Sequence, residues 1–244
     1  MHPFNDTSFD QPPYDGDVQS YMICTTPRVG GTLLGALLQS TQNMGVPHEY
    51  FHLNEVTQPL GKRWSLPERL STPVYLEALH KYRTTPNGIF ALKVHYVQLD
   101  GVLKQHSFLD FLKTIKTFVY VTRDDLLGQA VSYAKAHQTR NWSSLQEAKT
   151  SPTYDHKLIE RAMEDILAQN AHWQKFFALY DIQPLRIRYE DIVIAPNQTC
   201  RAICQAMGYE PKNAFNLEES PLKKQRDLVN KEWKNRFRRD LRSF

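Results

Sequence analysis

Apolar residues cluster in four short runs along the chain, and each run has the length of a strand. The runs are YMICTT (21–26), GIFALKV (88–94), TFVYVT (117–122) and PLRIRY (184–189). Two of them are continuous, without alternation of apolar and polar residues, which is typical of strands covered on both faces in a parallel sheet. The pattern therefore predicts a buried sheet of four strands.

Helical spacing of apolar residues appears between and after these runs. The expected helices span residues 32–43, 125–138, 156–180, 197–207 and 223–242. Thr32 is the expected cap of the first helix, and Gly208 follows the fourth, where a glycine commonly ends a helix. Strands that alternate with helices predict an α/β fold, with a single domain built on a parallel central sheet flanked by helices.

Polar and proline-bearing segments lie outside this pattern. Residues 1–19 are expected to form an N-terminal arm or a disordered tail ahead of one folded domain over residues 20–244. The arm lacks the charged and apolar regions of a signal peptide, and no apolar run approaches the length of a membrane span, so a cytoplasmic location is expected. Residues 53–75, which contain three prolines, are expected to form an excursion that carries binding loops.

The composition narrows the class of protein. Of the 244 residues, 41% are apolar, which is enough for a full core. The net charge of +4 suits a small ligand that carries phosphate, and it is too small for the dense basic stripe of a nucleic-acid-binding protein. The cysteines at 24, 200 and 204 are odd in number and lack the spacing of a disulfide framework, which indicates a reducing compartment.

The segment after the first apolar run has the features of a phosphate site. Arg28 precedes Gly30 and Gly31, and Thr32 opens the predicted helix. Glycines let the backbone approach a ligand closely, and the N–H groups at a helix N-terminus face an anion bound there. The loop lacks the Lys of a nucleoside-triphosphatase P-loop. An ordinary strand–turn–helix corner is the alternative interpretation, and we favour phosphate binding.

A second basic residue ends the third apolar run. Arg123 follows Thr122, and Ser132 lies nine positions after Arg123, in the helix that comes next. The planar fork of an Arg side chain suits bidentate contact with phosphate. A single Arg in such a place is usually structural or solvated. Two phosphate-suited strand ends in one sheet, however, predict a ligand with two separate phosphate groups.

Together these segments resemble the PAPS-dependent sulfotransferases, and within that superfamily the bacterial trehalose 2-sulfotransferase family. The matching pieces are TPRVGGTLL (26–34), GVPHEYF (45–51), PNGIFALK (86–93), RDDLLGQAVS with the following QT and W (123–142), and W with RFRRDL (233–241). The resemblance covers nearly the whole chain after the arm and implies the P-loop-NTPase-like sulfotransferase fold. PAPS, 3′-phosphoadenosine 5′-phosphosulfate, is a nucleotide with two separate phosphate positions.

The resemblance implies roles for individual residues around the nucleotide. Six loop residues would hold the 5′-phosphosulfate: Arg28, Val29, Gly30, Gly31, Thr32 and Leu33. Arg123 and Ser132 would hold the 3′-phosphate. The family loop usually reads R-S-G-S-T and here reads R-V-G-G-T, which removes one or two hydrogen bonds of about 1 kcal/mol each. The basic residues Arg236, Arg238 and Arg239 would either approach the nucleotide or form a solvated helix face.

The resemblance also implies the reaction. A sulfuryl group would pass from PAPS to a hydroxyl of a carbohydrate or glycolipid-type acceptor, with release of PAP and without a metal. Lys93 is the candidate for stabilising the transferred group. Glu49 and His95 are alternative general bases: the trehalose family has its proposed base at the position of Glu49, and residues 93–95 resemble the Lys-Thr-His of eukaryotic cytosolic sulfotransferases. Burial by aromatic neighbours is expected to raise the pKa of the Glu49 carboxyl.

Three other functions stay open at this point. His48, Glu49 and His52 match the H-E-x-x-H pattern of zinc peptidases, which requires both histidines on one helix face. Another phosphate-binding transferase or kinase-like protein would need the missing Lys, and a non-catalytic nucleotide-binding module would carry the same loops. The expected partner is a small molecule or a glycan rather than nucleic acid. A homodimer, which some relatives form, stays open beside a monomer.

Overall fold

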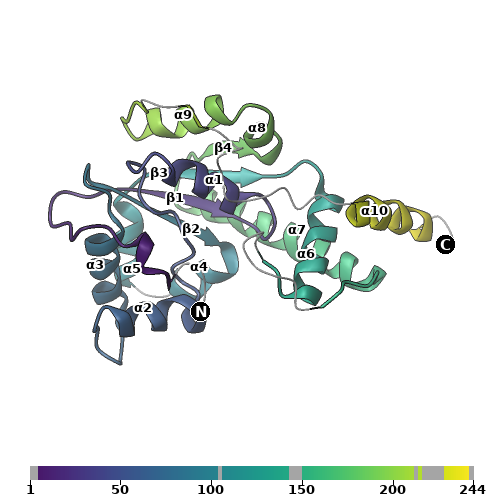
Figure 1. The fold of residues 1–244 in the computed structure, drawn as a ribbon, viewed down its shortest axis with the longest axis horizontal. Helices are drawn as coiled ribbons and strands as arrows, with labels where there is room; N and C mark the ends of the chain where they lie inside the picture. The colour runs from purple at the N-terminus through teal and green to yellow at the C-terminus, as the bar shows by residue number, and fades with distance from the viewer. Residues whose placement is uncertain (1–4, 104–105, 143–149, 212–213, 216–227, 242–244) are drawn as a thin grey trace.

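A four-stranded parallel sheet forms the centre of the protein (Figure 1). The structure is a computed structural model that describes residues 5–103, 106–142, 150–211, 214–215 and 228–241. The strands are β1 (Gln19–Thr25), β2 (Ile89–His95), β3 (Ile115–Thr122) and β4 (Leu185–Arg188). Their order is β2-β1-β3-β4, and each neighbouring pair is parallel. The predicted α/β fold with a parallel sheet is therefore confirmed.

Helices connect the strands and continue after the last of them. In the described residues they are η2 (Thr7–Phe9), α1 (Gly31–Gln39), η3 (Leu53–Thr57), α2 (Gln58–Arg63), α3 (Thr72–Arg83), α4 (Tyr96–Leu103), α5 (His106–Lys113), α6 (Leu126–Thr139), α7 (His156–Leu179), α8 (Tyr189–Ile194), α9 (Pro196–Ala206) and α10 (Leu228–Leu241). None of the helices in these ranges is long and apolar enough to cross a membrane.

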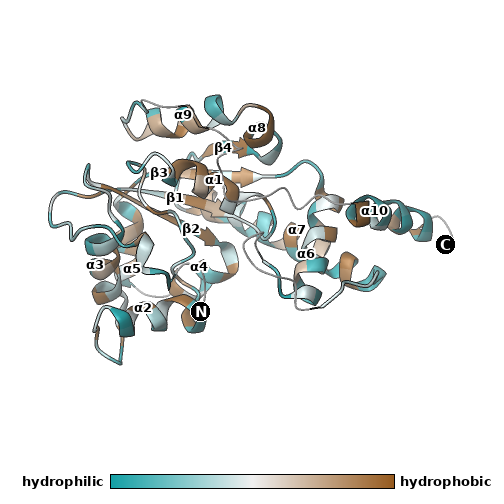
Figure 2. Ribbon diagram, viewed as in Figure 1, coloured by the Kyte–Doolittle hydropathy of each residue, from teal (hydrophilic) through white to brown (hydrophobic). Residues whose placement is uncertain are grey.

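Both faces of the sheet are covered by helices. Successive strand residues point to opposite faces. In β1, Tyr21 and Ile23 belong to a buried cluster with α1 and α9, whereas Met22 and Cys24 belong to another with α3, α5 and α7. All four side chains are fully buried. This two-sided cover explains why β1 is a continuous apolar run, and Figure 2 shows brown strands between helices with teal outer stretches.

Some expected boundaries were wrong. Thr32 does not cap α1, because the helix begins at Gly31 and Gly30 occupies the cap position with a φ of 100°. The helix also ends at Gln39, four residues before the expected end. Gly208 does follow α9, with a φ of 74°, as predicted. The first five residues of the expected C-terminal helix and its last residue lie outside the described residues.

The segment 53–75 is largely helical instead of a loop excursion. It contains η3, α2 and the start of α3. Two of its prolines occupy the first turns of α2 and α3. Proline is tolerated there because the first N–H groups of a helix have no partner within the helix. Two of the three prolines that suggested loops therefore mark helix starts, and Pro67 lies between helices.

A third cluster attaches α10 to the rest of the fold. Trp233 and Phe237 on α10 are buried against Ala130 and Ala134 on α6 and Ile166 on α7. Trp233 and Phe237 are four positions apart and therefore share one face of α10. When this face packs on α6 and α7, a second, basic face of α10 lies toward the N-terminal end of α6. That end of α6 follows β3 and Arg123.

Candidate active site

The candidate site lies where β1 and β2 end side by side. The two strands are parallel and in register, so that Thr25 at the end of β1 is opposite His95 at the end of β2. The loop after β1 and the last residues of β2 therefore reach the same edge of the sheet. In open α/β sheets, ligands bind at this carboxyl edge.

The loop between β1 and α1 depends on its glycines. Gly30 has a φ of 100°, and a Cβ on it would lie 2.4 Å from Cδ2 of Tyr189. Glycine is the residue that suits this position, because any side chain would disfavour the positive φ and collide with Tyr189. The loop then leads into α1, whose first-turn N–H groups point out of the helix end. An anion at this helix end would face those N–H groups, so the cradle stays a prediction.

Glu49 is brought to this edge by a short extension of the sheet. His48 forms an isolated parallel bridge with Leu92, and the backbone N–H of Lys93 donates to the carbonyl of His48 (2.9 Å). Residue 49 therefore follows immediately after a point that is bonded to the edge of β2. In this position the side chain of Glu49 reaches that of Lys93.

The carboxylate of Glu49 has three polar neighbours. Its Oε1 lies 2.7 Å from Nζ of Lys93 and 3.4 Å from Nε2 of His95. Its Oε2 accepts a hydrogen bond from Nε2 of Gln98 (2.8 Å), and Oε1 of Gln98 accepts one from the backbone N–H of His95 (3.0 Å). The two candidate bases thus lie in one hydrogen-bonded cluster.

The expected rise in the Glu49 pKa is wrong. Burial does act to raise the pKa of this carboxyl, but the charge of Lys93 and the imidazole of His95 outweigh it and hold the pKa well below its ordinary value. The sequence suggested only the aromatic neighbours, whereas the direction of the shift is set by two groups that come from another strand. Glu49 is therefore a carboxylate at neutral pH.

Lys93 also connects this cluster with the loop. Its Nζ donates to Oγ1 of Thr32 (2.7 Å) in the first turn of α1, and its side chain is 2% exposed. Thr25 makes a second connection, because its Oγ1 lies 2.9 Å from Nδ1 of His95. Gln98 and Thr25 were not among the predicted residues. The one available signal for Gln98 was weak: it is a polar residue one helical turn after His95, a candidate base.

The two predicted phosphate sites meet at Arg28. Nε of Arg28 donates to Oγ of Ser132 (3.0 Å), and Nη1 of Arg123 donates to the carbonyl oxygen of Arg28 (3.2 Å). The Arg28 side chain therefore lies with Ser132 and Arg123, although its backbone belongs to the first loop. Burial and the charge of Arg123 lower the pKa of Arg28 to about 10.

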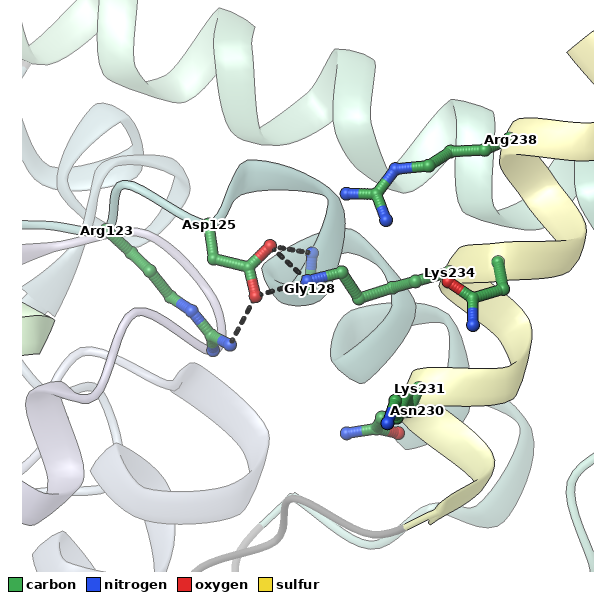
Figure 3. Close-up of a pocket in the computed structure, with 8 residues that line it drawn as sticks. Arg123, Asp125, Gly128, Asn230, Lys231, Lys234 and Arg238 are labelled. Carbon is green, nitrogen blue, oxygen red and sulfur yellow. Dashed lines mark hydrogen bonds and ion pairs between the residues drawn. The ribbon is translucent and has the colours of Figure 1, made fainter.

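A cavity of about 310 Å³ opens beside Arg123, and α10 lines one side of it (Figure 3). Its lining residues are Arg123, Asp125, Gly128, Asn230, Lys231, Lys234, Asn235 and Arg238. Nζ of Lys234 reaches both oxygens of Asp125 (2.6 and 2.7 Å), and Arg123 approaches Asp125 from the other side (3.9 Å). Four cationic side chains and one carboxylate line this cavity, so its lining carries an excess of positive charge.

The sequence located this basic surface only in part. Arg238 was a candidate and lines the cavity, whereas the guanidinium of Arg236 lies 4.0 Å from the ring centroid of Tyr154. Lys231 and Lys234 were missed. Their spacing with Arg238 places all three on one helix face, and that periodicity was the available signal.

The peptidase pattern has a different structure from the one that binds zinc. His48 is in an extended bridge, residues 49–52 are not helical, and the His52 ring lies 3.9 Å from Glu55. The two histidines therefore do not share a helix face, which the zinc motif requires. Among the described residues, no group of three or more His, Cys, Asp or Glu side chains could hold a metal ion.

Known proteins were compared with this chain. The sequence model of the Stf0 sulphotransferase family matches residues 20–240. Trehalose 2-sulfotransferase of Mycolicibacterium smegmatis is 23% identical and that of Mycobacterium tuberculosis 25% identical, each over 91% of this chain and 95% of the relative. The crystal structure of a sulfotransferase from Alicyclobacillus acidocaldarius superposes with a TM-score of 0.52 at 13% identity, over 92% of this chain and 93% of that chain, and shows a shared fold.

The family match spans the whole of the site. It includes β1 from its second residue, the other three strands, the loop after β1, the cluster around Glu49 and the cavity beside α10. The predicted resemblance to the sulfotransferases is therefore confirmed, and the chain belongs to the Stf0 sulphotransferase family.

Proposed function

We propose that this protein transfers a sulfuryl group from PAPS to a hydroxyl of a carbohydrate or glycolipid-type acceptor and releases PAP. The position of Lys93 carries the proposal, because its ammonium contacts both Thr32 of the loop and the carboxylate of Glu49. A donor held by the loop and an acceptor hydroxyl beside Glu49 would meet at this one cation. Fixed positioning and charge stabilisation of this kind account for much of enzymatic catalysis.

The residues around the loop fit a nucleotide with two separate phosphate groups. The first turn of α1 and the ammonium of Lys93 suit the 5′ group. Arg123, Ser132 and the side chain of Arg28 suit the 3′ group, because Arg forks match phosphate oxygens. Bound PAPS would supply the sulfuryl group. The support is this match of charge and spacing to the ligand, together with the membership of the family.

In the proposed reaction, Glu49 removes the proton of the acceptor hydroxyl. Its lowered pKa keeps it ionised at neutral pH, which is the form that accepts a proton, and also makes it a weaker base than a carboxylate whose pKa lies near neutral pH. His95, 3.4 Å away, is the alternative acceptor of the same proton. Lys93 stabilises the negative charge that develops on the oxygens between donor and acceptor.

A carbohydrate acceptor agrees with the similarity to two trehalose 2-sulfotransferases. Tyr50, Phe51, Trp64 and Trp142 are aromatic side chains of a kind that can stack on a sugar ring, and the first three are used in packing. Tyr50 is fully buried, Phe51 packs against Phe108, and Trp64 stacks on Tyr82. The Trp142 ring also meets the rings of Tyr133 and His137, but the residue is 37% exposed, and its carbonyl accepts a hydrogen bond from Arg28. We therefore propose Trp142 as the aromatic residue that contacts the acceptor.

Two measurements test this function. Calorimetric titration should show PAP binding far more tightly than AMP, because only PAP has the 3′-phosphate. Transfer of label from ³⁵S-PAPS should then occur to trehalose or to another sugar in a panel of hydroxyl acceptors. Equal affinity for PAP and AMP would reject the donor assignment. Tight PAP binding without transfer to any acceptor would favour a non-catalytic nucleotide-binding module.

A further inference from the structure

Residues 5–11, which we call the N-terminal clamp, lie against the segment that carries Glu49. They precede the region matched by the family, residues 20–240. The ring of Phe9 meets the ring of His48 edge to face, with centroids 4.5 Å apart. His48 is the residue immediately before Glu49 and is only 7% exposed. The clamp therefore contacts the residue that directly precedes the candidate base in the chain.

A partly buried cluster of Asp10 with Arg63 and Arg83 anchors the clamp. Both carboxylate oxygens of Asp10 accept hydrogen bonds from Nη2 of Arg63 (2.6 and 2.8 Å), and Nη2 of Arg83 lies 3.1 Å from Asp10 Oδ1. The Arg83 side chain is fully buried, and its guanidinium lies 5.9 Å from the ring centroid of Phe9 and 5.7 Å from that of Tyr50. The charge of Asp10 is therefore matched by a cation that also touches the residue after Glu49.

The clamp holds the far end of the same segment as well. Nδ2 of Asn5 donates to the carbonyl of Glu55 (2.7 Å), and Arg63 donates to the carbonyl of Asn5. Gln11 continues the attachment through a backbone hydrogen bond to the carbonyl of Tyr82 (2.8 Å). Residues 48–55 are therefore contacted at their start through Phe9 and at their end through Asn5.

The sheet alone gives this segment little support. His48 pairs with β2 through an isolated bridge to Leu92, and within the described residues β2 is the edge strand of the sheet. A single bridge fixes one residue and leaves the orientation of the following side chain to its packing. The reach of Glu49 to Lys93 and His95 depends on that orientation, and a shift near 1 Å is enough to impair catalysis by about 100-fold.

We propose that the N-terminal clamp, through Phe9 on His48 and Asp10 on Arg83, positions Glu49 for proton transfer. Phe9 is in this view a positioning residue, which acts on the reaction through His48 without contacting substrate. The inference rests on the proposed function of Glu49. It extends the functional unit to residues ahead of the family match.

The test replaces Phe9 and compares two controls. Phe9→Ala removes the ring from His48, Phe9→Tyr restores a ring, and Tyr14→Ala removes an equally large side chain from the same arm. Tyr14 contacts Gly16 and donates to the carbonyl of Asp17, away from His48. The carboxyl signal of Glu49 is followed by ¹³C NMR across pH in each variant. Calorimetry gives the Kd of PAP, and labelled PAPS gives kcat and KM with the sugar acceptors.

The expected result is specific to Phe9→Ala. The Glu49 signal shifts and titrates at higher pH as the carboxyl moves from Lys93, kcat falls roughly 10- to 100-fold, and the Kd of PAP stays within about twofold. Phe9→Tyr and Tyr14→Ala behave like the parent. A parental Glu49 signal in folded Phe9→Ala would overturn the inference. So would an equal loss of PAP affinity and turnover, which indicates general loosening. Failure of the parent to bind PAP would reject the proposed function, while the Glu49 signal still decides whether the clamp acts on that residue.

Discussion

Nζ of Lys93 and Oε1 of Glu49 lie 2.7 Å apart, in an ion pair between β2 and the segment that runs beside it. The Lys93 side chain is 2% exposed and that of Glu49 is 17% exposed, so the pair is largely removed from solvent. A pair of this kind is sensitive to the loss of either member, because the other is left as an uncompensated buried charge. This relationship underlies the first two predictions.

Glu49→Gln is expected to destabilise the protein in a pH-dependent way. The folded pKa of Glu49 lies well below the ordinary value of 4.5, so its ionisation stabilises the fold above that value, and the contribution is lost as the pH falls through the folded pKa. At pH 7 the variant should lose about 3–5 kcal/mol of unfolding free energy. Urea denaturation at pH 7 and pH 3 checks this. The difference in unfolding free energy between parent and variant should be smaller at pH 3 than at pH 7. Glu160→Gln, at an exposed position of α7, should show no such difference at either pH.

The same substitution should separate binding from chemistry. Glu49→Gln keeps the hydrogen-bonding shape of the side chain but cannot accept the proton, so turnover should fall roughly 10²-fold or more while PAP affinity is retained. Single-turnover transfer with labelled PAPS, under conditions where circular dichroism shows a folded variant, measures this. His95→Asn is the matched comparison. If it abolishes turnover and Glu49→Gln does not, His95 is the base.

Gly31→Ala should disturb the side chains that pack against the first turn of α1. A Cβ on Gly31 would lie 2.6 Å from Cγ2 of Thr25 and 3.1 Å from Cδ of Lys93, so the new methyl group meets two side chains of the Glu49 cluster. Overpacking of this kind costs about 1–3 kcal/mol, and both the melting temperature and the PAP affinity should drop. The matched control is Gly101→Ala in α4, where a Cβ has no neighbour within 4 Å. A Gly31→Ala variant that melts and binds PAP like Gly101→Ala would contradict the prediction.

Arg123→Ala should remove the preference for PAP over AMP. The Arg123 side chain is 8% exposed beside the cavity, and a charged hydrogen bond to the 3′-phosphate is worth about 1.5–3 kcal/mol. Titration of both nucleotides against parent and variant gives the difference. Arg188→Ala is the control, because Arg188 is half exposed at the end of β4 and pairs with Asp124 and Asp191. An unchanged ratio of PAP to AMP affinity in Arg123→Ala would show that the 3′-phosphate is read elsewhere.

The sequence alone predicted the architecture because local patterns dictate it. Apolar runs located four strands, two of them continuous as in strands covered on both faces, and adjacent glycines identified the turn into α1. Arg28, Lys93 and Arg123 were recognised as site candidates because each stands near the carboxyl end of a strand. These features need only a few neighbouring residues to be recognised, so they could be read before any contact was known.

The contacts between distant segments were decided by the tertiary structure alone. The register of β1 on β2 sets His95 opposite Thr25, the bridge at His48 brings Glu49 to Lys93, and packing of α10 on α6 adds Lys234 to the cavity beside Arg123. No local pattern contains these distances. The direction of the Glu49 pKa shift shows the consequence. Burial could be expected from the aromatic neighbours, but Lys93 and His95, which outweigh it, lie on β2, and electrostatic interaction depends on separation in space.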